Sequence, residues 1–249
     1  MTVPAPGPVE AFRALHRAPE PLVLPNVWDA VSARAFAGAG FPALATSSSA
    51  VAAALGYADG ETTPADEMFA AVARIARSVD VPVTADVERG YGLAPAEIVR
   101  RLLEAGAAGC NLEDSDPATR EPVGPERQAE WLAEVCAEAD GRLLVNARID
   151  TYLRGAPDPL AAAVERGRLY AAAGAGCLYP ICAPPEHLSV LASETGLPVN
   201  ALCVPGGPSP AELGALGAAR VTFGGSLHAR SAAALARTAA ELRAGRGCL

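Results

Sequence analysis

The chain has 249 residues, of which 51% are hydrophobic, and a formal net charge of −8 at pH 7. This composition supplies a sizeable core, and the negative charge argues against nucleic acid or an anionic membrane as a partner. No apolar run is long enough for a transmembrane helix, so we expect no membrane association. The first ten residues lack the basic and apolar segments of a signal peptide, and we therefore expect a cytoplasmic protein.

Residue types that are rare or absent exclude several enzyme classes. All 20 basic residues are arginine. Without lysine the chain cannot be a Schiff-base aldolase, a lysine-anchored pyridoxal phosphate enzyme or a P-loop NTPase. The 6 cysteines form no C-x-x-C pair, and we expect reduced thiols rather than a zinc or dithiol site. With only 3 histidines, acid–base chemistry must depend mainly on carboxylates, hydroxyls, water or a metal.

Short apolar runs alternate along the chain with longer amphipathic segments. We predict strands at 22–24, 43–46, 81–86, 109–113, 143–148, 177–181, 199–202 and 220–223. We predict helices at 29–38, 64–79, 94–105, 125–139, 158–173, 184–194, 209–216 and 226–244. This α/β alternation over 249 residues predicts a single (β/α)₈ TIM barrel domain spanning residues 1–249. A doubly wound open sheet is the alternative, because alternation alone does not prove closure.

Polar residues stand where the predicted strands end. Asp86 and Glu88 follow the third strand in P-V-T-A-D-V-E-R-G-Y-G, and on a continuing strand both would project from one face. A hard cation such as Mg²⁺ or Mn²⁺ would offset the repulsion between these carboxylates. Other polar residues at strand ends are Asn26, Ser47, Ser48, Ser49, Glu113, Asp114, Arg148, Asp150, Tyr179 and Asn200. Because barrel strands end at one common mouth, we expect the active site there.

Five segments, in this order, resemble the isocitrate lyase/phosphoenolpyruvate mutase superfamily. They read L-P-N-V-W-D-A-V-S-A-R, A-T-S-S-S-A-V-A-A-A-L-G-Y-A-D-G, T-A-D-V-E-R-G-Y-G, A-G-A-A-G-C-N-L-E-D-S and V-N-A-R-I-D-T-Y. The resemblance covers nearly the whole chain, from about Leu24 to about Arg230. It implies a barrel that binds a small carboxylic acid, a 2-oxo acid, over a metal. It also implies a homo-oligomer, commonly a dimer of dimers whose C-terminal helices are exchanged between subunits.

The resemblance implies a metal site made of four acids. Asp86 matches the carboxylate that ligates the metal directly, and Glu88 stands where many relatives have the second Asp of a D-x-D. Asp59 and Glu113 match acids that reach the metal largely through water. Mg²⁺ keeps several of its waters in proteins, so one direct ligand with water-bridged acids is chemically reasonable.

The resemblance also implies how a substrate is held. Ser47, Ser48 and Ser49 fall on the loop whose hydroxyl and amides bind the carboxylate and oxo oxygens of the substrate. Arg148 matches the arginine that pairs with the far acidic group, for which its bidentate fork is suited. Asn200, at a predicted strand end, is a further substrate-binding candidate. Ser47, Glu113 and Arg148 are the catalytic candidates.

The segment 115–125, S-D-P-A-T-R-E-P-V-G-P, departs from the family pattern. The lyases of the superfamily carry K-[KR]-C-G-H there, with a catalytic cysteine, and the phosphonomutases carry a lysine and an asparagine. This chain has neither set. Arg120 and Glu121 either form a substituted gate or belong to a solvated loop.

These observations favour a Mg²⁺-dependent lyase. Its substrate would be a small 2-oxo or 2-hydroxy di- or tricarboxylate, broken by C–C cleavage or decarboxylation through a stabilised enolate. Two alternatives remain open. One is C–P chemistry, as a mutase or hydrolase, on a phosphonopyruvate-like substrate. The other is a catalytically silent barrel that binds an acid or takes part in an assembly.

Overall fold

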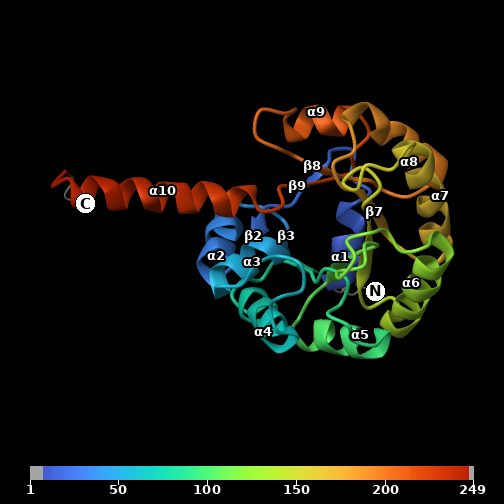
Figure 1. The fold of residues 1–249 in the computed structure, drawn as a ribbon, viewed down its shortest axis with the longest axis horizontal. Coiled ribbons are helices and arrows are strands. Elements are labelled where there is room, and N and C mark those ends of the chain that lie inside the picture. Colours follow the sequence, from blue (N-terminus) through green and yellow to red (C-terminus); the bar gives the residue numbers. More distant parts are fainter. Residues whose placement is uncertain (1–7, 247–249) are drawn as a thin grey trace, which may run out of the picture.

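The computed structural model describes residues 8–246, which form a parallel barrel surrounded by helices (Figure 1). The strands are β1 (Leu22–Val23), β2 (Asn26–Val27), β3 (Leu44–Thr46), β4 (Val83–Asp86), β5 (Gly109–Glu113), β6 (Leu144–Ile149), β7 (Cys177–Pro180), β8 (Asn200–Leu202) and β9 (Arg220–Thr222). Strands β2 to β7 pair in sequence order, and β1, β9 and β8 pair in that order.

Two contacts close these sheets into a barrel. β1 and β2 are the halves of one barrel strand, interrupted at Pro25, which has no N–H to donate. β1 pairs with β9 and β2 pairs with β3, so this strand joins the two sheets at one seam. At the other seam a parallel bridge links Leu178 of β7 to Val199, just before β8. The (β/α)₈ prediction is confirmed, and the open sheet is wrong.

The helices lie around the strands. Their bounds are α1 (Pro8–Leu15), α2 (Ala30–Gly38), α3 (Ser48–Leu55), α4 (Ala65–Ala76), α5 (Pro95–Glu104), α6 (Pro125–Ala139), α7 (Pro159–Ala172), α8 (Leu188–Thr195), α9 (Pro210–Ala215) and α10 (Ser226–Arg243), with a 3₁₀ turn, η1, at Pro185–His187. The main hydrophobic cluster lies between the strands and α5 to α8. Of these elements, α1 and α3 were not predicted from the sequence.

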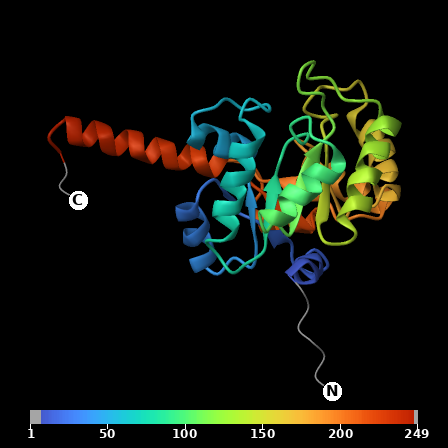
Figure 2. The same ribbon diagram turned by 90° about the horizontal axis from the view of Figure 1, so that it is seen from below.

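Helix α1 closes the end of the barrel opposite the long loops (Figure 2). Its Phe12 is fully buried among apolar side chains that include Leu24, Ala45 and Leu144. Arg13 donates from Nη2 to the carbonyl oxygen of Leu143 at 2.8 Å. Eight residues do not form a stable helix by themselves, so burial against the barrel stabilises this one and local sequence gives little sign of it.

Helix α10 extends away from the barrel (Figures 1 and 2). None of its 18 residues is buried, and the side chains of Leu235 and Leu242 are 70% and 55% exposed. Within residues 8–246, no helix is both long and apolar enough to cross a membrane. The predicted helix at 226–244 is therefore present, but it does not pack on the barrel of its own chain along most of its length.

His16, which follows α1, links the stability of the fold to pH. It is buried, and its Nδ1 lies 2.9 Å from the carbonyl oxygen of Phe12. Burial, with the nearby charge of Arg220, lowers the pKa of His16 from 6.5 to about 4. The unfolded chain therefore binds this proton more readily than the folded chain does. The contribution of His16 to stability is fully present above pH 6.5 and is lost as the pH falls from 6.5 towards about 4.

We expect the His16→Gln variant to lack this component of acid sensitivity. Between pH 7 and pH 4.5 the unchanged protein should lose about 2 kcal/mol more unfolding free energy than the variant does. Urea unfolding at both pH values measures the difference. Because carboxylates titrate equally in both proteins, only the difference between them reports on His16. Equal losses in the two proteins would show that the buried imidazole charges without cost.

Candidate active site

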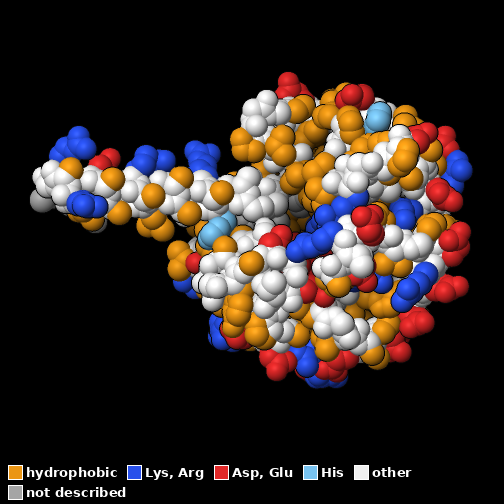
Figure 3. Space-filling view, in the orientation of Figure 1, with side chains coloured by type: hydrophobic (Ala, Val, Ile, Leu, Met, Phe, Trp, Pro, Cys, Tyr) orange, Lys and Arg blue, Asp and Glu red, His pale blue; other side chains and the backbone are white. Residues whose placement is uncertain are grey.

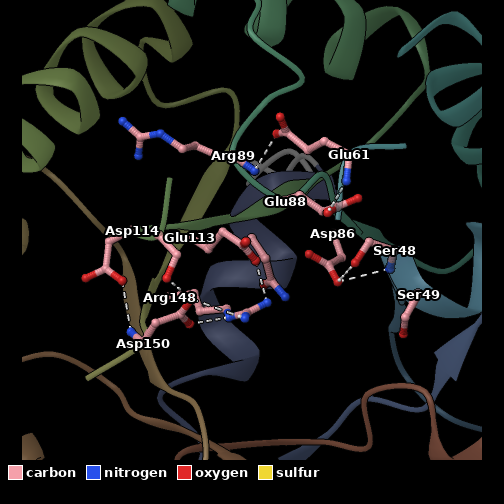
Figure 4. Close-up of polar contacts among 12 residues, drawn as sticks. Ser48, Ser49, Glu61, Asp86, Glu88, Arg89, Glu113, Asp114, Arg148 and Asp150 are labelled. Atoms are coloured by element: carbon pink, nitrogen blue, oxygen red, sulfur yellow. Dashed lines mark hydrogen bonds and ion pairs between the residues drawn. The ribbon is translucent and has the colours of Figure 1, made fainter. Parts of the chain in front are cut away.

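Asp86 ends β4 with one carboxylate oxygen held and the other available. Its backbone N–H donates to Thr46 Oγ1 at 2.8 Å. Its Oδ2 accepts from the N–H of Ser48 at 3.0 Å and from Ser48 Oγ at 2.8 Å (Figure 4). No hydrogen bond within residues 8–246 involves Oδ1. The side chain is thus oriented by the neighbouring strand, with an oxygen free for a ligand.

The three serines are not on a loop, as the sequence predicted, but at the N-terminus of α3. Ser47 is the N-cap: its Oγ accepts from the N–H of Ala50 at 3.4 Å and lies 3.0 Å from Ser49 Oγ. Three successive serines are unfavourable inside a helix, which is why the run is typical of a loop, yet serine is favoured at a helix start. Free N–H groups at a helix start attract anions. Here Ser48 donates its N–H to Asp86 and Ala50 donates its N–H to Ser47, which leaves the N–H of Ser49 for a carboxylate.

Glu88 does not continue the strand of Asp86, so the predicted common face is wrong. Its φ of +50° turns the chain out of the sheet. Its Oε2 accepts from the N–H of Glu61 at 2.7 Å, and its Oε1 accepts from Tyr91 Oη at 2.7 Å. Burial, reinforced by the charges of Asp86 and Asp59, raises the pKa of Glu88 to about 7. Glu88 therefore holds the two loops together and adds to the negative charge beside Asp86.

Glu61, which sequence reasoning missed, completes this connection. Its Oε1 accepts from the N–H of Arg89 at 3.0 Å and from the N–H of Tyr91 at 2.7 Å (Figure 4). The loop that carries Asp59 is thus fastened to the loop that follows β4. Asp59 is exposed to solvent, but partial desolvation of its carboxylate and the charge of Asp86 together raise its pKa. The positive φ of Glu61, +58°, is the kind of feature that a sequence does not show.

Glu113 and Arg148 face each other from neighbouring strands. Arg148 Nη1 lies 2.5 Å from Glu113 Oε2, and Arg148 Nε donates to Asp150 Oδ1 at 2.7 Å. Burial and the charges of Asp150, Asp86 and Glu88 raise the pKa of Glu113 to about 8, although Arg148 acts in the opposite direction. β4 and β5 pair in parallel with Asp86 opposite Asn111, two residues before Glu113, so the acids of both strands lie at the same end of the barrel (Figure 4).

Asn200 lies elsewhere than predicted. It begins β8 rather than ending it, and it is fully buried. Its Nδ2 donates to Thr222 Oγ1 of β9 at 2.9 Å. The short segment between Leu197 and Leu202 offers no signal of where its strand starts. We therefore place Asn200 deeper in the barrel than the mouth and assign it a structural bond.

A buried network behind the mouth was also missed. The fully buried Asp114 accepts from Arg166 Nη1 at 3.0 Å and from Tyr170 Oη at 2.9 Å, both on α7. It also accepts from the N–H of Asp150 at 2.9 Å, and Asp150 in turn holds Arg148 (Figure 4). The adjacent acids in L-E-D-S are the sequence signal for this network. Successive residues of a strand point to opposite faces, so Asp114 points away from the mouth that Glu113 faces. A buried carboxylate on that side needs a cationic partner.

The donor set fits a hard cation. Asp59, Glu88 and Glu113 have raised pKa values because burial and mutual repulsion oppose their charges. A cation near the free oxygen of Asp86 would relieve this repulsion, and oxygen ligands suit Mg²⁺ or Mn²⁺. In the described part of the chain, no three acidic, histidine or cysteine side chains enclose an ion by themselves. Waters would therefore complete the coordination, as is usual for Mg²⁺.

Comparison with known proteins identifies the family. The profile of the family described as phosphoenolpyruvate phosphomutase matches residues 12–243. The chain belongs to this family. It is therefore an enzyme of the isocitrate lyase/phosphoenolpyruvate mutase superfamily. This confirms the resemblance found in the sequence.

Individual relatives include both lyases and phosphonate enzymes. A proposed phosphonomutase from Burkholderia cenocepacia J2315 is 41% identical with a TM-score of 0.89, covering 93% of this chain and 98% of that one. A probable 2-methylisocitrate lyase 2 of Corynebacterium glutamicum is 33% identical over 180 residues, which is 68% of this chain but only 58% of the lyase. Phosphonopyruvate hydrolase, solved with oxalate and Mg²⁺, shares the fold at 22% identity and a TM-score of 0.85, with 97% of this chain and 89% of that one covered.

We expect the Arg166→Met variant to be strongly destabilised, because it leaves the buried carboxylate of Asp114 without its cation. The loss of unfolding free energy should be about 3–5 kcal/mol. Arg168→Met is the matched control on the same helix, since Arg168 pairs with Glu194 at the exposed surface. Its loss should be below about 1 kcal/mol. Denaturant unfolding compares the two, and equal losses would contradict a buried charge role for Asp114.

Proposed function

We propose that this chain is a Mg²⁺- or Mn²⁺-dependent lyase that acts on a small 2-oxo or 2-hydroxy di- or tricarboxylate. It would break a C–C bond by cleavage or decarboxylation. The observation that carries the proposal is the asymmetric mouth: Asp86 presents a free oxygen on one side, and Arg148 presents a guanidinium on the other. A silent barrel would not need buried acids whose charges repel one another at this end.

The residues of this chain would divide the work between two ends of the substrate. At one end, the N–H of Ser49 and the hydroxyls of Ser47 and Ser49 would bind the carboxylate and oxo oxygens. At the other end, Arg148 would orient the acidic group, because Glu113 and Asp150 hold its guanidinium in place. A metal beside Asp86, Asp59, Glu88 and Glu113 would supply Lewis-acid stabilisation of the developing enolate charge.

The proton that the enolate takes up would come from solvent. The segment 115–125 holds no cysteine, histidine or lysine, so it lacks the acid of the cysteine-containing lyases. General acid catalysis contributes about 10²–10⁴-fold to a rate. We therefore propose decarboxylation or a related cleavage in preference to efficient isocitrate or methylisocitrate cleavage.

C–P chemistry is the second candidate, favoured by one observation. The similarity to a proposed phosphonomutase, at 41% identity and over nearly all of both chains, exceeds that to the lyases. A phosphonate would also suit the fork of Arg148. Release of phosphate or formation of phosphoenolpyruvate from phosphonopyruvate distinguishes this candidate from 2-oxo acid or CO₂ release.

We expect Asp86→Ala to abolish Mg²⁺-dependent binding of oxalate, a stable mimic of a 2-oxo acid enolate, while the fold persists. Calorimetry with and without Mg²⁺ measures this binding, and circular dichroism checks the fold. Asp66→Ala, at an exposed position on α4, is the control and should bind oxalate as the unchanged protein does. Unchanged oxalate affinity in folded Asp86→Ala would remove this residue from the metal site.

We also propose that α10 is exchanged between subunits of a homo-oligomer. Exposed Leu235 would otherwise remain in water beside an apolar groove formed with Trp28, Val31 and Phe36 of the α2 region.

Leu235→Asp should shift the protein to a smaller species in size-exclusion chromatography with light scattering. Arg237→Asp, on the same helix, is the control. If the unchanged protein is already a monomer, the proposed exchange of α10 is wrong.

A further inference from the structure

The segment that departs from the family pattern is an ordered hairpin over the mouth. Ser115 and Pro122 form an antiparallel bridge, and the N–H of Asp116 donates to the carbonyl oxygen of Glu121 at 2.9 Å. The N–H of Arg120 donates back to the carbonyl oxygen of Asp116 at 2.8 Å. The turn thus satisfies its own backbone groups and presents Arg120 at its tip.

Both stems of the hairpin are fastened to the network behind Arg148. Ser115 Oγ donates to Asp150 Oδ2 at 2.6 Å, and Asp150 is the carboxylate that holds Arg148. On the other stem, Arg166 Nη2 donates to the carbonyl oxygen of Val123 at 2.8 Å. The hairpin is therefore held in register with the site rather than hanging free in solvent.

Arg120 reaches from this tip across to the loop of Asp59. A methyl group added at Gly60 would lie 2.9 Å from both Cζ and Nη1 of Arg120, so the guanidinium rests directly on the Gly60 backbone. Gly60 adjoins Asp59 in the chain, so the guanidinium lies beside one of the acids of the candidate metal site, on a face of the barrel where basic side chains gather near the centre (Figure 3).

The two arginines differ in how many donors are free. Arg148 pairs through Nη1 with Glu113 and donates from Nε and Nη2 to Asp150. The Arg120 guanidinium makes no hydrogen bond or ion pair with any side chain in residues 8–246. The exposed Arg120 thus offers a planar fork with free donors beside Gly60, and such a fork matches a carboxylate or phosphonate.

We propose that Arg120 is a specificity-determining residue that joins Arg148 in binding the anionic group at the outer end of the substrate. It supplies free donors there, because Arg148 is already paired with Glu113 and Asp150. It selects 2-oxo acids with a second acidic group over those with an apolar end. This inference rests on the proposed function, because the 2-oxo group must first occupy the Asp86 end of the mouth. It assigns to the hairpin a recognition role in place of the proton donation made by the cysteine-containing loop.

Matched ligands separate recognition at the two ends. The probes are oxalate, which fills only the metal end, and two pairs of 2-oxo acids of equal length: oxaloacetate with 2-oxobutyrate, and 2-oxoglutarate with 2-oxopentanoate. With Mg²⁺ present, competition against oxalate measures each affinity. We expect the unchanged protein to bind at least one diacid about tenfold or more tightly than its monoacid partner, as charge-assisted bonds require.

Arg120→Gln should remove this preference and leave oxalate and the monoacids within about twofold of their original affinities. Arg120→Lys, which keeps the charge without the fork, should retain part of it. Arg127→Gln, which removes the same charge from the exposed first turn of α6, is the control and should keep the preference.

Three results would overturn the inference. They are equal affinities for diacid and monoacid in the unchanged protein, a parallel loss of oxalate and diacid binding in Arg120→Gln, and the same loss in Arg127→Gln. Each leaves the proposed function standing, provided that oxalate binds with Mg²⁺. If the unchanged protein binds no oxalate with Mg²⁺, the proposed function itself fails.

Discussion

The mouth of the barrel depends on the compensation of negative charge. The charge of Asp86 adds to the burial that opposes ionisation of Glu88 and Glu113, and Arg148 is the cation that pairs with Glu113. Burying like charges together is unfavourable unless cations and hydrogen-bond donors are arranged around them. Much of the surrounding structure can be understood as that arrangement, from the Ser48 amide on Asp86 to the Glu61 amide on Glu88.

Support for this charge extends from the mouth into the helices. Asp150 orients Arg148, its backbone is held by Asp114, and Asp114 is neutralised by Arg166 of α7. The same two residues, Asp150 and Arg166, hold the stems of the hairpin. A hairpin connected in this way is positioned by the same bonds that position the arginine of the site. Altering one part of the network therefore affects both substrate orientation and the cover of the mouth.

The family relationship and the site together narrow the chemistry. Superfamily members include lyases and mutases, and the mouth of this chain holds the acids and the arginine that the sequence resemblance leads us to expect there. What distinguishes it from the family pattern given in the sequence analysis is the hairpin, which carries Arg120 and no cysteine, histidine or lysine. Under the proposed function, such a change would keep the part of the site that stabilises an enolate and alter the part that receives the rest of the substrate.

The sequence by itself determined the barrel and the positions of Asp86, Glu113 and Arg148. Strand and helix periods are local properties, and strand ends in a barrel converge whatever the loops do. Other features depended on contacts between distant segments. Glu88 left the strand because its carboxylate bonds to the Glu61 amide, 27 residues away. Helix α1 formed because Phe12 fills the end of the barrel.

Arg120 and Arg166 illustrate the same limit. Nothing around Arg120 in the chain indicates that its guanidinium rests on Gly60, and nothing around Arg166 names Asp114 as its partner, 52 residues earlier. A side chain's charge is evident from the sequence. The sequence does not show which opposite charge or backbone surface that side chain meets. The fold decides this by bringing loops from different strands to one mouth, because hydrogen bonds and ion pairs act over a few ångströms of space and not along the chain.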